Sequence, residues 1–209
     1  MKNDNINKPI IYTIGHSNHD INYFLEMLNK YEINCIIDIR SVPSSRFNPQ
    51  YNQTNINRFL NENGVEYLHL PKEFGAWKST PELLDSDGIL DFEKVIESKS
   101  FKNGLEIIKN CISKGLRISL MCSEHDPLSC HRFSLVSIGL ENVGFNIMHI
   151  LRDKSLMSNY DLKNTLLKKY KRKLSQPNLF DNNITIEDQL KEALRLKNKE
   201  IGYSPNSHK

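Results

Sequence analysis

Hydrophobic positions along this chain follow two different periods. Nearly continuous apolar runs with the pattern of buried β-strands occur at 10–14, 35–39, 65–70, 116–121 and 145–151. The segments between these runs place apolar residues three and four positions apart, as at Ile21, Phe24 and Leu28, which is the spacing of one helix face. Strands that alternate with helices predict an α/β fold, with a mainly parallel, Rossmann-like sheet of about five strands covered by helices on both faces.

Residues at the ends of the helical patterns support this assignment. Asp20 precedes the first pattern as an expected N-cap, and Thr185 and Asp188 have the spacing of a capping box at the start of the last one. Gly64 and Gly144 stand where two other patterns end, Gly144 in the position of a C-terminal cap. Further helices are expected at 100–115 and 158–173, with a short one from 91.

Four segments are expected along the chain. Residues 1–9 form a polar N-terminal tail without the apolar core of a signal peptide, and residues 10–152 form the α/β core domain. Residues 153–201 are expected to form a C-terminal helical extension, and residues 202–209 a disordered tail. Within the core, the connection from 71 to 100 is longer than a simple crossover, and such connections tend to be lids or to carry functional residues.

Composition is that of an ordinary globular protein, with 38% hydrophobic and 25% charged residues. No apolar run approaches the roughly 18 residues of a membrane span, and four cysteines in a chain of this size do not form a secreted disulfide framework, so we expect a cytoplasmic protein. The net charge of +3 is too small by itself to imply a nucleic-acid partner. The basic residues within 163–173 have two interpretations, a phosphate-binding patch or, as we favour, the solvated face of a helix.

Reactive side chains are concentrated in residues 122–132, which join an apolar strand to a helical pattern. Polar or titratable residues also end or follow the other four expected strands. Since parallel strands end at a common edge of the sheet, we expect these residues to line one crevice, where α/β folds bind ligands. His69 and His149 are exceptions, because each is more simply interpreted as a hydrogen-bonded histidine of the core.

The residues of this crevice are assigned roles by their chemistry. Candidates for proton transfer or nucleophilic attack are His16, Asp38, Glu124, Cys130 and His131. Candidates for substrate binding are Ser17, Arg40, Ser45, Arg46, Tyr67, Cys122 and Arg132. The three arginines would bind an anion, although Asp38 and Arg40 lie two residues apart on a strand and have the alternative interpretation of a salt bridge.

Cys130 has the features of a thiol with a lowered pKa. It begins a helical pattern and is followed by His131 and Arg132, and both a helix N-terminus and positive charge stabilise a thiolate. Zinc binding by Cys122, His125, Cys130 and His131 is an alternative with the right ligand types, but adjacent residues rarely chelate one ion well. We therefore expect no cofactor and keep zinc as the less favoured alternative.

Four short motifs occur in order between residues 10 and 152. They are Thr13-Ile14-Gly15-His16-Ser17, Asp38-Ile39-Arg40 with Pro43 and Ser45-Arg46, Tyr67-Leu68-His69-Leu70, and Cys122-Ser123-Glu124 through Cys130-His131-Arg132. Taken together, these motifs resemble those of the domain of unknown function 488 family. The resemblance implies an α/β fold with a shared polar site and brings no established reaction.

A further motif lies outside that region. Gln176-Pro177-Asn178-Leu179-Phe180 resembles the Gln-x-x-Leu-Phe peptide by which many bacterial DNA-processing proteins bind the replication sliding clamp. In such a peptide the Leu and Phe side chains anchor in an apolar groove, while Gln hydrogen-bonds in a smaller pocket. The alternative is that Leu179 and Phe180 pack the last helix onto the core.

These observations lead to one leading hypothesis. We expect an enzyme, a hydrolase or transferase, that acts on a phosphate-bearing substrate such as a nucleotide or nucleic acid at the carboxyl edge of the sheet. The main alternative is a module that binds a nucleotide or nucleic acid without catalysis, with cysteines that only pack. No membrane partner is expected.

Overall fold

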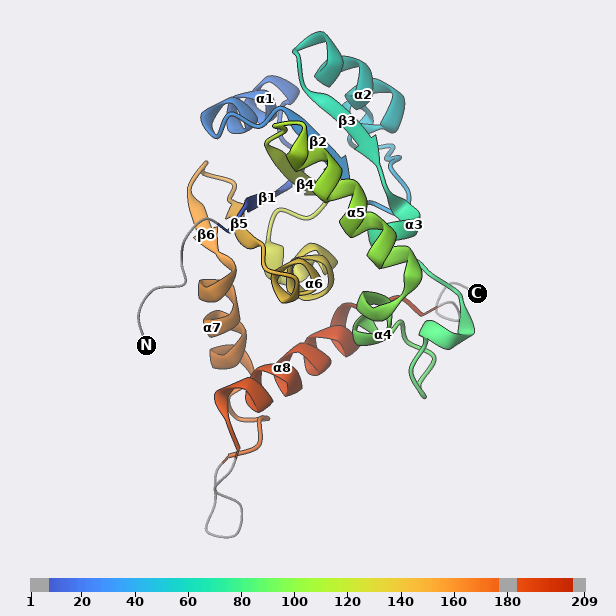
Figure 1. Ribbon diagram of the computed structural model, residues 1–209, viewed down its shortest axis with the longest axis vertical. Helices are drawn as coiled ribbons and strands as arrows, with labels where there is room; N and C mark the ends of the chain where they lie inside the picture. The colour runs from blue at the N-terminus through green and yellow to red at the C-terminus, as the bar shows by residue number, and fades with distance from the viewer. Residues whose placement is uncertain (1–7, 177–183, 205–209) are drawn as a thin grey trace.

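The computed structural model describes residues 8–176 and 184–204, which form a six-stranded sheet covered by helices (Figure 1). The strands are β1 (Ile10–Gly15), β2 (Cys35–Asp38), β3 (Glu66–His69), β4 (Ile118–Cys122), β5 (Asn146–Ile150) and β6 (Leu156–Ser158). Their order is β3-β2-β4-β1-β5-β6, and neighbouring strands are parallel except for β5 and β6. The expected α/β fold with a mainly parallel sheet is confirmed.

The sixth strand lies in a segment for which the sequence predicts only helices. A turn joins it to β5, in which the backbone N–H of Leu151 donates to the carbonyl of Ser155 at 2.9 Å. A three-residue strand is too short to show a hydrophobic period, so its pairing is decided by the backbone groups that β5 leaves open along its edge.

The central strands point successive side chains to opposite faces of the sheet. Cys35 and Ile37 of β2 belong to one core cluster, whereas Ile36 belongs to the other, and all three are fully buried. Because both faces are covered, these strands occur in the sequence as continuous apolar runs instead of an alternating pattern.

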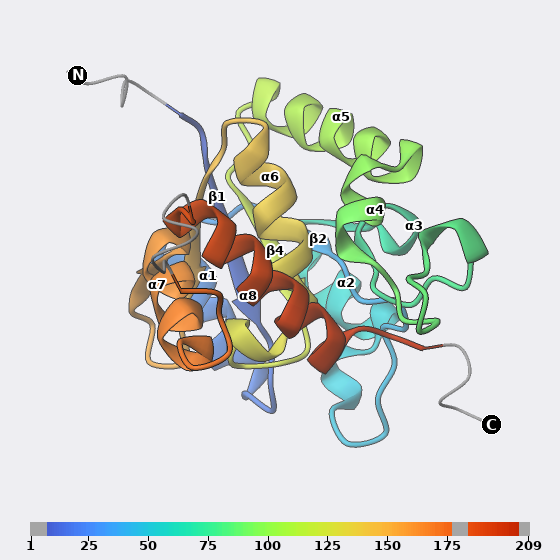
Figure 2. The same cartoon turned by 90° about the horizontal axis from the view of Figure 1, so that it is seen from below.

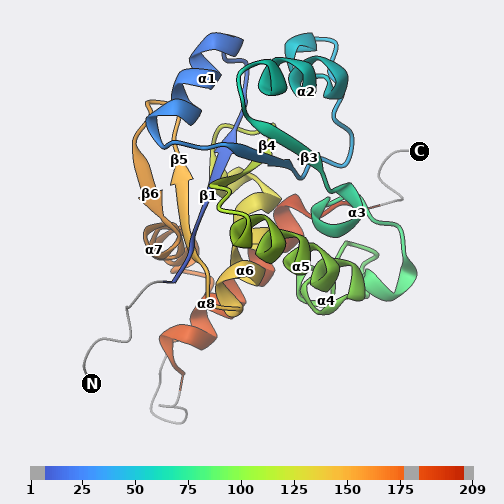
Figure 3. The same cartoon turned by 45° about the horizontal axis from the view of Figure 1, so that its top comes forward.

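Helices cover the two faces in two groups. The helical segments are α1 (Ile21–Lys30), α2 (Gln53–Glu62), α3 (Pro71–Phe74), α4 (Phe92–Glu97), α5 (Lys99–Ser113), α6 (Ile138–Asn142), α7 (Asn159–Tyr170) and α8 (Ile186–Ile201), with 3₁₀ turns η1 (Pro49–Tyr51), η2 (Pro81–Leu83) and η3 (Pro127–Ser129) and a π-helix, η4 (Arg132–Ser137). Figure 3 shows α1 and α2 on one side of the sheet and α3 to α6 on the other. The chain runs outward from β1 to β3 and then returns to β4 and β5, so right-handed crossovers place the two groups on opposite faces.

Helix ends agree with the capping residues in the sequence. The side chain of Asp20 accepts hydrogen bonds from the backbone N–H groups of Asn22 and Tyr23 at the start of α1. Thr185 and Asp188 form both hydrogen bonds of a capping box at the start of α8. Gly144, just beyond α6, has a φ of +97°, a left-handed conformation that favours glycine.

The last two helices pack against the α/β core. Phe133 of η4 belongs to a hydrophobic cluster with Leu162 and Leu166 of α7 and Ala193 of α8. Figure 2 shows α8 running across the molecule from α7 towards α4, where Arg195 forms an ion pair with Glu93 at 2.8 Å. Helix α8 therefore brings residues 202–204 to the opposite side of the core from α7.

Residues 202–204 correct the expectation of a disordered tail from Gly202. The carbonyl of Tyr203 accepts a hydrogen bond from the backbone N–H of Leu90 at 2.9 Å, and the N–H of Gly202 donates to Asn198. The sequence gives no local signal of the bond between Leu90 and Tyr203, because the two residues are more than one hundred positions apart. None of the helices within 8–176 and 184–204 has the length and apolar character needed to cross a membrane.

The connections that follow β1 and β4 leave the sheet over opposite faces. Helix α1 leaves β1 over one face, whereas η4 and α6 follow β4 over the other face. These strands are neighbours, with Gly15 opposite Cys122 at their carboxyl ends. Adjacent parallel strands whose connections leave in opposite directions form the crevice where α/β folds bind ligands.

Candidate functional site

The loop after β4 gathers three side chains with nucleophilic or metal-binding atoms. Cys122 ends β4, and Cys130 and His131 lie between η3 and η4. Nδ1 of His131 is 3.9 Å from Sγ of Cys122 and 3.9 Å from Sγ of Cys130. The loop is shaped by Asp126, whose carboxylate accepts hydrogen bonds from the N–H of Leu128 and the hydroxyl of Ser129. The loop thereby returns the chain to the end of β4.

The two cysteines of this cluster have opposite electrostatic properties. Burial by itself would raise the pKa of Cys130, but the neighbouring Cys122 thiol and the positive charges of His131 and Arg132 lower the pKa well below its ordinary value. The pKa of Cys122 is raised by the neighbouring Cys130 and by burial. Burial opposes the charge on His131, yet the negative charge of Cys130 gives a net rise in its pKa. The shifts favour the charged forms of Cys130 and His131 and the neutral thiol of Cys122.

Glu124 adds a carboxyl group beside the pair. The thiol of Cys122 donates a hydrogen bond to Oε2 of Glu124, with 3.0 Å between the two atoms. Although Glu124 as a residue is exposed, local desolvation of its carboxyl group and the negative charge of Cys130 raise its pKa. A carboxyl group with a raised pKa holds its proton closer to neutral pH, which suits a general acid.

Arg132, an expected substrate-binding residue, has hydrogen-bond partners within the protein. Its side chain is fully buried, and the guanidinium donates to the carbonyls of Glu124 and of His125, the latter at 2.9 Å. These bonds direct Arg132 toward the backbone of the loop instead of toward an external anion. The positive charge of Arg132 still lowers the pKa of Cys130. Arg132 therefore holds the loop in place and favours the thiolate form of Cys130.

Gly15 allows the end of β1 to approach this loop. A Cβ atom at this position would lie 1.8 Å from the carbonyl oxygen of Glu124 and 2.9 Å from Nη1 of Arg132. The N–H groups of the next two residues, His16 and Ser17, donate to the carbonyls of Cys122 and Ser123. The glycine of the first motif is therefore required for the close contact between the two strand ends.

A second polar group at the same sheet edge forms a closed network. Arg40 donates to both carboxylate oxygens of Asp38, through Nε at 2.9 Å and Nη2 at 2.6 Å, and the hydroxyl of Tyr67 donates to the same carboxylate at 2.6 Å. Asp38 and Arg40 are 0% and 4% exposed. Nη2 of Arg40 also donates to the carbonyl of Tyr51 at 2.8 Å. The salt-bridge interpretation of Asp38 and Arg40 therefore describes their contacts, and Arg40 is not directed outward to an anion.

His16 completes the closed network as a neutral side chain. Its Nδ1 lies 2.8 Å from the carbonyl of Ser17 and therefore donates, which leaves Nε2 to accept from Nη1 of Arg40 at 3.1 Å. Burial and the charge of Arg40 lower the pKa of His16 to about 4. The ring stacks on Tyr51 with 4.1 Å between centroids. Both ring nitrogens are thus engaged within the protein.

The remaining expected substrate-binding residues lie in turns. The hydroxyl of Ser17 donates to Asn18, and its backbone has a φ of +49°. The hydroxyl of Ser45 accepts from the N–H groups of Phe47 and Asn48, both at 3.2 Å, which closes the turn that carries Arg46. Arg46 is exposed to solvent. The structure therefore does not bring the three expected arginines together in one cradle.

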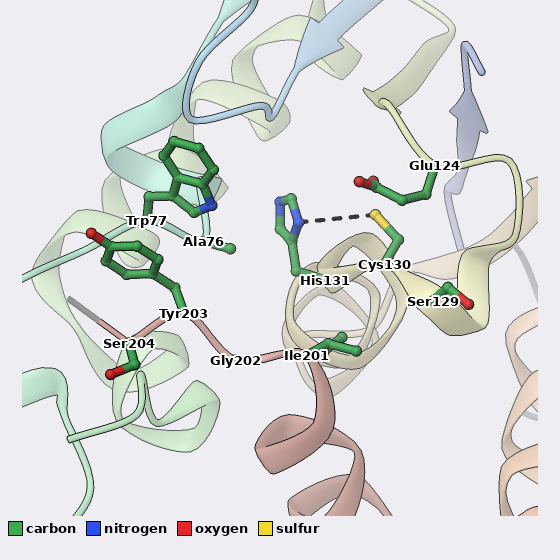
Figure 4. Close-up of a pocket in the computed structure, with 10 residues that line it drawn as sticks. All are labelled: Ala76, Trp77, Glu124, Ser129, Cys130, His131, Ile201, Gly202, Tyr203 and Ser204. Carbon is green, nitrogen blue, oxygen red and sulfur yellow. Dashed lines mark hydrogen bonds between the residues drawn. The ribbon is translucent and has the colours of Figure 1, made fainter. Parts of the chain in front are cut away.

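A cavity of about 260 Å³ opens beside the Cys130–His131 pair (Figure 4). It is lined by residues 76–77, 124, 129–131 and 201–204. Figure 4 shows Trp77 and Tyr203 on one side and Cys130 and Glu124 on the other, with His131 between them. Three expected catalytic residues thus share one cavity, whereas His16 and Asp38 lie in the closed network.

Comparison with known proteins supports the resemblance seen in the sequence. The family model described as domain of unknown function DUF488 matches residues 20–138, which is more than half of the chain. The chain belongs to the DUF488 family. No match to it was found among curated proteins or among solved structures. The matched part of this DUF488 protein contains both Cys130 and the Asp38–Arg40 pair.

Two aromatic residues of the cavity were missed by sequence reasoning. Trp77 lies in the connection from 71 to 100, whose length predicts a functional segment. The sequence therefore indicates the segment but not Trp77 itself. Tyr203 lies in the segment expected to be disordered, and nothing local in the sequence of this DUF488 protein indicates its position. Tyr203 lines the cavity because it follows α8, which ends there at Ile201.

Three further histidines of this DUF488 protein do not line the cavity. His149 is fully buried between the hydroxyl of Thr13 at 2.7 Å and the side chain of Asn159 at 3.1 Å, as expected of a core histidine. His69 is half-buried, with Nε2 at 2.8 Å from the carbonyl of Arg40. His125 is exposed, and it does not belong to the cluster of the two cysteines and His131.

The cysteine cluster of this DUF488 protein also has the dimensions of a metal site. The ligand atoms of Cys122, Cys130 and His131 all lie within 4.8 Å of one another. Tetrahedral zinc, with bonds of about 2.3 Å to sulfur and 2.0–2.1 Å to nitrogen, separates such atoms by roughly 3.5–3.8 Å. The observed sulfur–nitrogen separations of 3.9 Å are close to this range. Of the four expected zinc ligands, His125 is not part of the cluster. The ligand atoms of the adjacent residues Cys130 and His131 do lie close together.

Proposed function

We propose that this protein is an enzyme, a hydrolase or transferase, that acts on a phosphate-bearing substrate with Cys130 as its nucleophile. The observation that supports the proposal is the position of the Cys130 thiol, which is paired with His131 and borders a cavity. A thiolate is the reactive form of cysteine, and a neighbouring imidazolium maintains it at neutral pH.

The residues around Cys130 suit a covalent reaction in two steps. The Cys130 thiolate would attack an electrophilic carbon or phosphorus atom of the substrate, forming a bond to sulfur while the leaving group departs. Glu124, with its raised pKa, would give its proton to the leaving group. Water would then release the product in a hydrolase, or a second substrate would accept the group in a transferase, with Glu124 recovering a proton in that step.

Phosphate binding rests on a different part of the site. Arg40 and Arg132 are occupied by internal partners, so the exposed Arg46 is the residue offered for an anion. Its loop begins at Ser41, whose hydroxyl accepts a hydrogen bond from the backbone N–H of Trp77 at 2.9 Å. The arginine loop is thereby connected to the wall of the cavity. A substrate with a reactive group in the cavity and a phosphate outside, as in a nucleotide, fits this arrangement.

Binding and turnover can be tested in sequence. A panel of nucleoside mono-, di- and triphosphates and short DNA is screened by thermal shift, where a ligand at a hundred times its Kd adds about 2.7 kcal/mol of stability. Any compound that stabilises the protein is then assayed for turnover. We expect Cys130→Ser to lower kcat by at least about a thousandfold, and Cys111→Ser, a change at a core cysteine, to leave it unchanged.

The outcomes separate the hypotheses. Stabilisation without turnover would favour a non-catalytic binding module. If no phosphate-bearing compound stabilises the protein, the proposed substrate class is wrong. Full activity in the Cys130→Ser variant would exclude the nucleophile while leaving the substrate class in place.

A second candidate function is favoured by the geometry of the Cys122, Cys130 and His131 cluster, which would hold zinc. Such an ion, with a fourth position open, supplies a Lewis acid and activates water. Elemental analysis of purified protein would then find about one equivalent of zinc, lost in both Cys122→Ser and Cys130→Ser. Metal-free protein with a rapidly alkylated Cys130 would exclude this candidate.

A place in DNA processing depends on the motif that begins at Gln176. Gln176 is exposed, and its side chain donates to the carbonyls of Lys171 and Leu174 at the end of α7, whereas Leu179 and Phe180 lie outside the described residues. We expect a Leu179→Ala, Phe180→Ala double variant to lose binding to a replication sliding clamp with an unchanged melting temperature. A fall of several degrees would instead show that these side chains pack in the core. This role belongs in the cytoplasm, where cysteines stay reduced.

A further inference from the structure

Trp77 and Tyr203 form an aromatic pair at the mouth of the cavity. Their rings lie nearly parallel, with 5.7 Å between centroids and 20° between planes. Trp77 is 58% exposed although it is a large apolar side chain. Figure 4 shows the pair facing His131 and Cys130 across the cavity. An exposed indole beside reactive groups marks a surface that a ligand can cover.

The backbone holds both aromatic residues in place. The N–H of Trp77 donates to the hydroxyl of Ser41, and the carbonyl of Tyr203 accepts from Leu90. Gly202 makes the approach feasible, because a Cβ atom there would lie 2.6 Å from the carbonyl oxygen of Asn198 and 2.6 Å from Cγ2 of Ile89. Segments far apart in the sequence therefore fix the pair before any ligand binds, which lowers the entropy that binding must overcome.

We propose that Trp77 and Tyr203 form a stacking platform for a nucleobase, which positions the substrate against Cys130. The proposal rests on the proposed function, since it names the group by which the nucleotide is held. Aromatic side chains bind nucleobases through their flat faces with little dependence on sequence. A cavity of about 260 Å³ is at the small end of ligand sites. It therefore suits a planar ring, with the sugar and phosphate outside towards the loop of Arg46.

The chain contains one tryptophan, so its fluorescence reports directly on Trp77. The protein is titrated with nucleoside monophosphates, the corresponding free nucleosides and ribose 5-phosphate. We expect saturable quenching by nucleotides and nucleosides and an unchanged signal with ribose 5-phosphate. Quenching by ribose 5-phosphate alone, or by none of the compounds, would overturn the platform.

Variants separate the platform from the chemistry. Tyr203→Leu should weaken nucleotide binding by about five- to a hundredfold, the usual effect of losing one stacking surface. The matched control is Tyr160→Leu, a change at a 69% exposed tyrosine on α7, which should leave both binding and quenching unchanged. Equal affinity in the two variants would contradict the proposal.

Cys130→Ser distinguishes the two proposals, because it removes the nucleophile and keeps the platform. Quenching that persists without turnover in any form of the protein would support the platform and reject the enzyme. Turnover of a nucleotide without quenching, and with an unchanged KM in Tyr203→Leu, would support the enzyme and reject the platform.

Discussion

Two groups of polar side chains lie at the same edge of the sheet, and they differ in what their polar atoms contact. In the group of His16, Asp38, Arg40 and Tyr67, the carboxylate, guanidinium and ring nitrogens bond to one another or to nearby backbone. In the other group, Glu124, Cys130 and His131 line a cavity, and Cys122 contacts Glu124 and His131. The sequence motifs for both groups are equally rich in titratable residues.

The difference shows why residue type alone is a weak guide to a site. A buried ion pair is stable only when its remaining hydrogen-bonding capacity is satisfied, and the closed network meets this condition with Tyr51 and Tyr67. The cysteine cluster instead has a thiol with a lowered pKa beside the carboxyl group of Glu124 and a cavity. The closed network therefore holds the strand ends together, whereas the proposed chemistry rests on the cysteine cluster.

The largest expected effect comes from opening the closed network. Asp38→Ala leaves the charge of Arg40 buried without its partner, and such losses destabilise by about 3–5 kcal/mol. At roughly 2–4 °C per kcal/mol for a chain of this size, the melting temperature should fall by roughly 6–20 °C. Calorimetry measures the change.

Glu124→Ala is the matched control, because it removes a carboxylate from the open cluster. Its melting temperature should stay close to that of the unmodified protein, within about 0.5 kcal/mol of stability. Equal losses in the two variants would erase the distinction between the groups.

Acid should destabilise the closed network next most strongly. The pKa of His16 is lowered to about 4 by burial and Arg40, whereas in the unfolded chain His16 takes up a proton near 6.5. The unfolded state therefore binds more protons between these values, and stability decreases as the pH falls from about 6.5 to about 4. From His16 the loss is about 3 kcal/mol, and His149, with its pKa lowered to about 3 by burial and Arg132, adds to it.

Urea unfolding at pH 7 and pH 4.5 measures this dependence. His16→Gln should reduce the difference between the two pH values, since glutamine can accept from Arg40 and does not titrate. An identical difference in the variant would mean that His16 is not the neutral member of the network.

The smallest expected effect concerns the thiolate in the open cluster. Iodoacetamide should alkylate Cys130 with a pH midpoint below the roughly 8.5 of free cysteine, since the pKa is lowered by Cys122, His131 and Arg132 despite burial. His131→Asn should shift that midpoint upward and slow alkylation at pH 7 by about tenfold, or about 1.4 kcal/mol. Peptide mass mapping gives the rate at Cys130.

His125→Asn, a change at an exposed histidine of the same loop, should leave the rate unchanged. A slow Cys130 in the unmodified protein would reassign both cysteines to packing.

The amino-acid sequence by itself determined the local features of this protein. Each central strand is predicted by a continuous apolar run. Capping residues such as Asp20 and Thr185 form hydrogen bonds with residues within one helical turn of themselves. The convergence of strand ends also follows from the sequence, because parallel strands share one carboxyl edge.

Tertiary structure alone decided which polar groups are open. Cys130 and Arg132 are two residues apart, yet the two terminal guanidinium nitrogens of Arg132 donate to loop carbonyls, whereas the thiol of Cys130 borders a cavity. Tyr203 reaches that cavity because α8 carries it to Leu90, a residue remote in sequence. Hydrogen-bond partners, burial and the resulting pKa shifts depend on groups that only folding brings together, whereas periodicity and capping depend on neighbours along the chain.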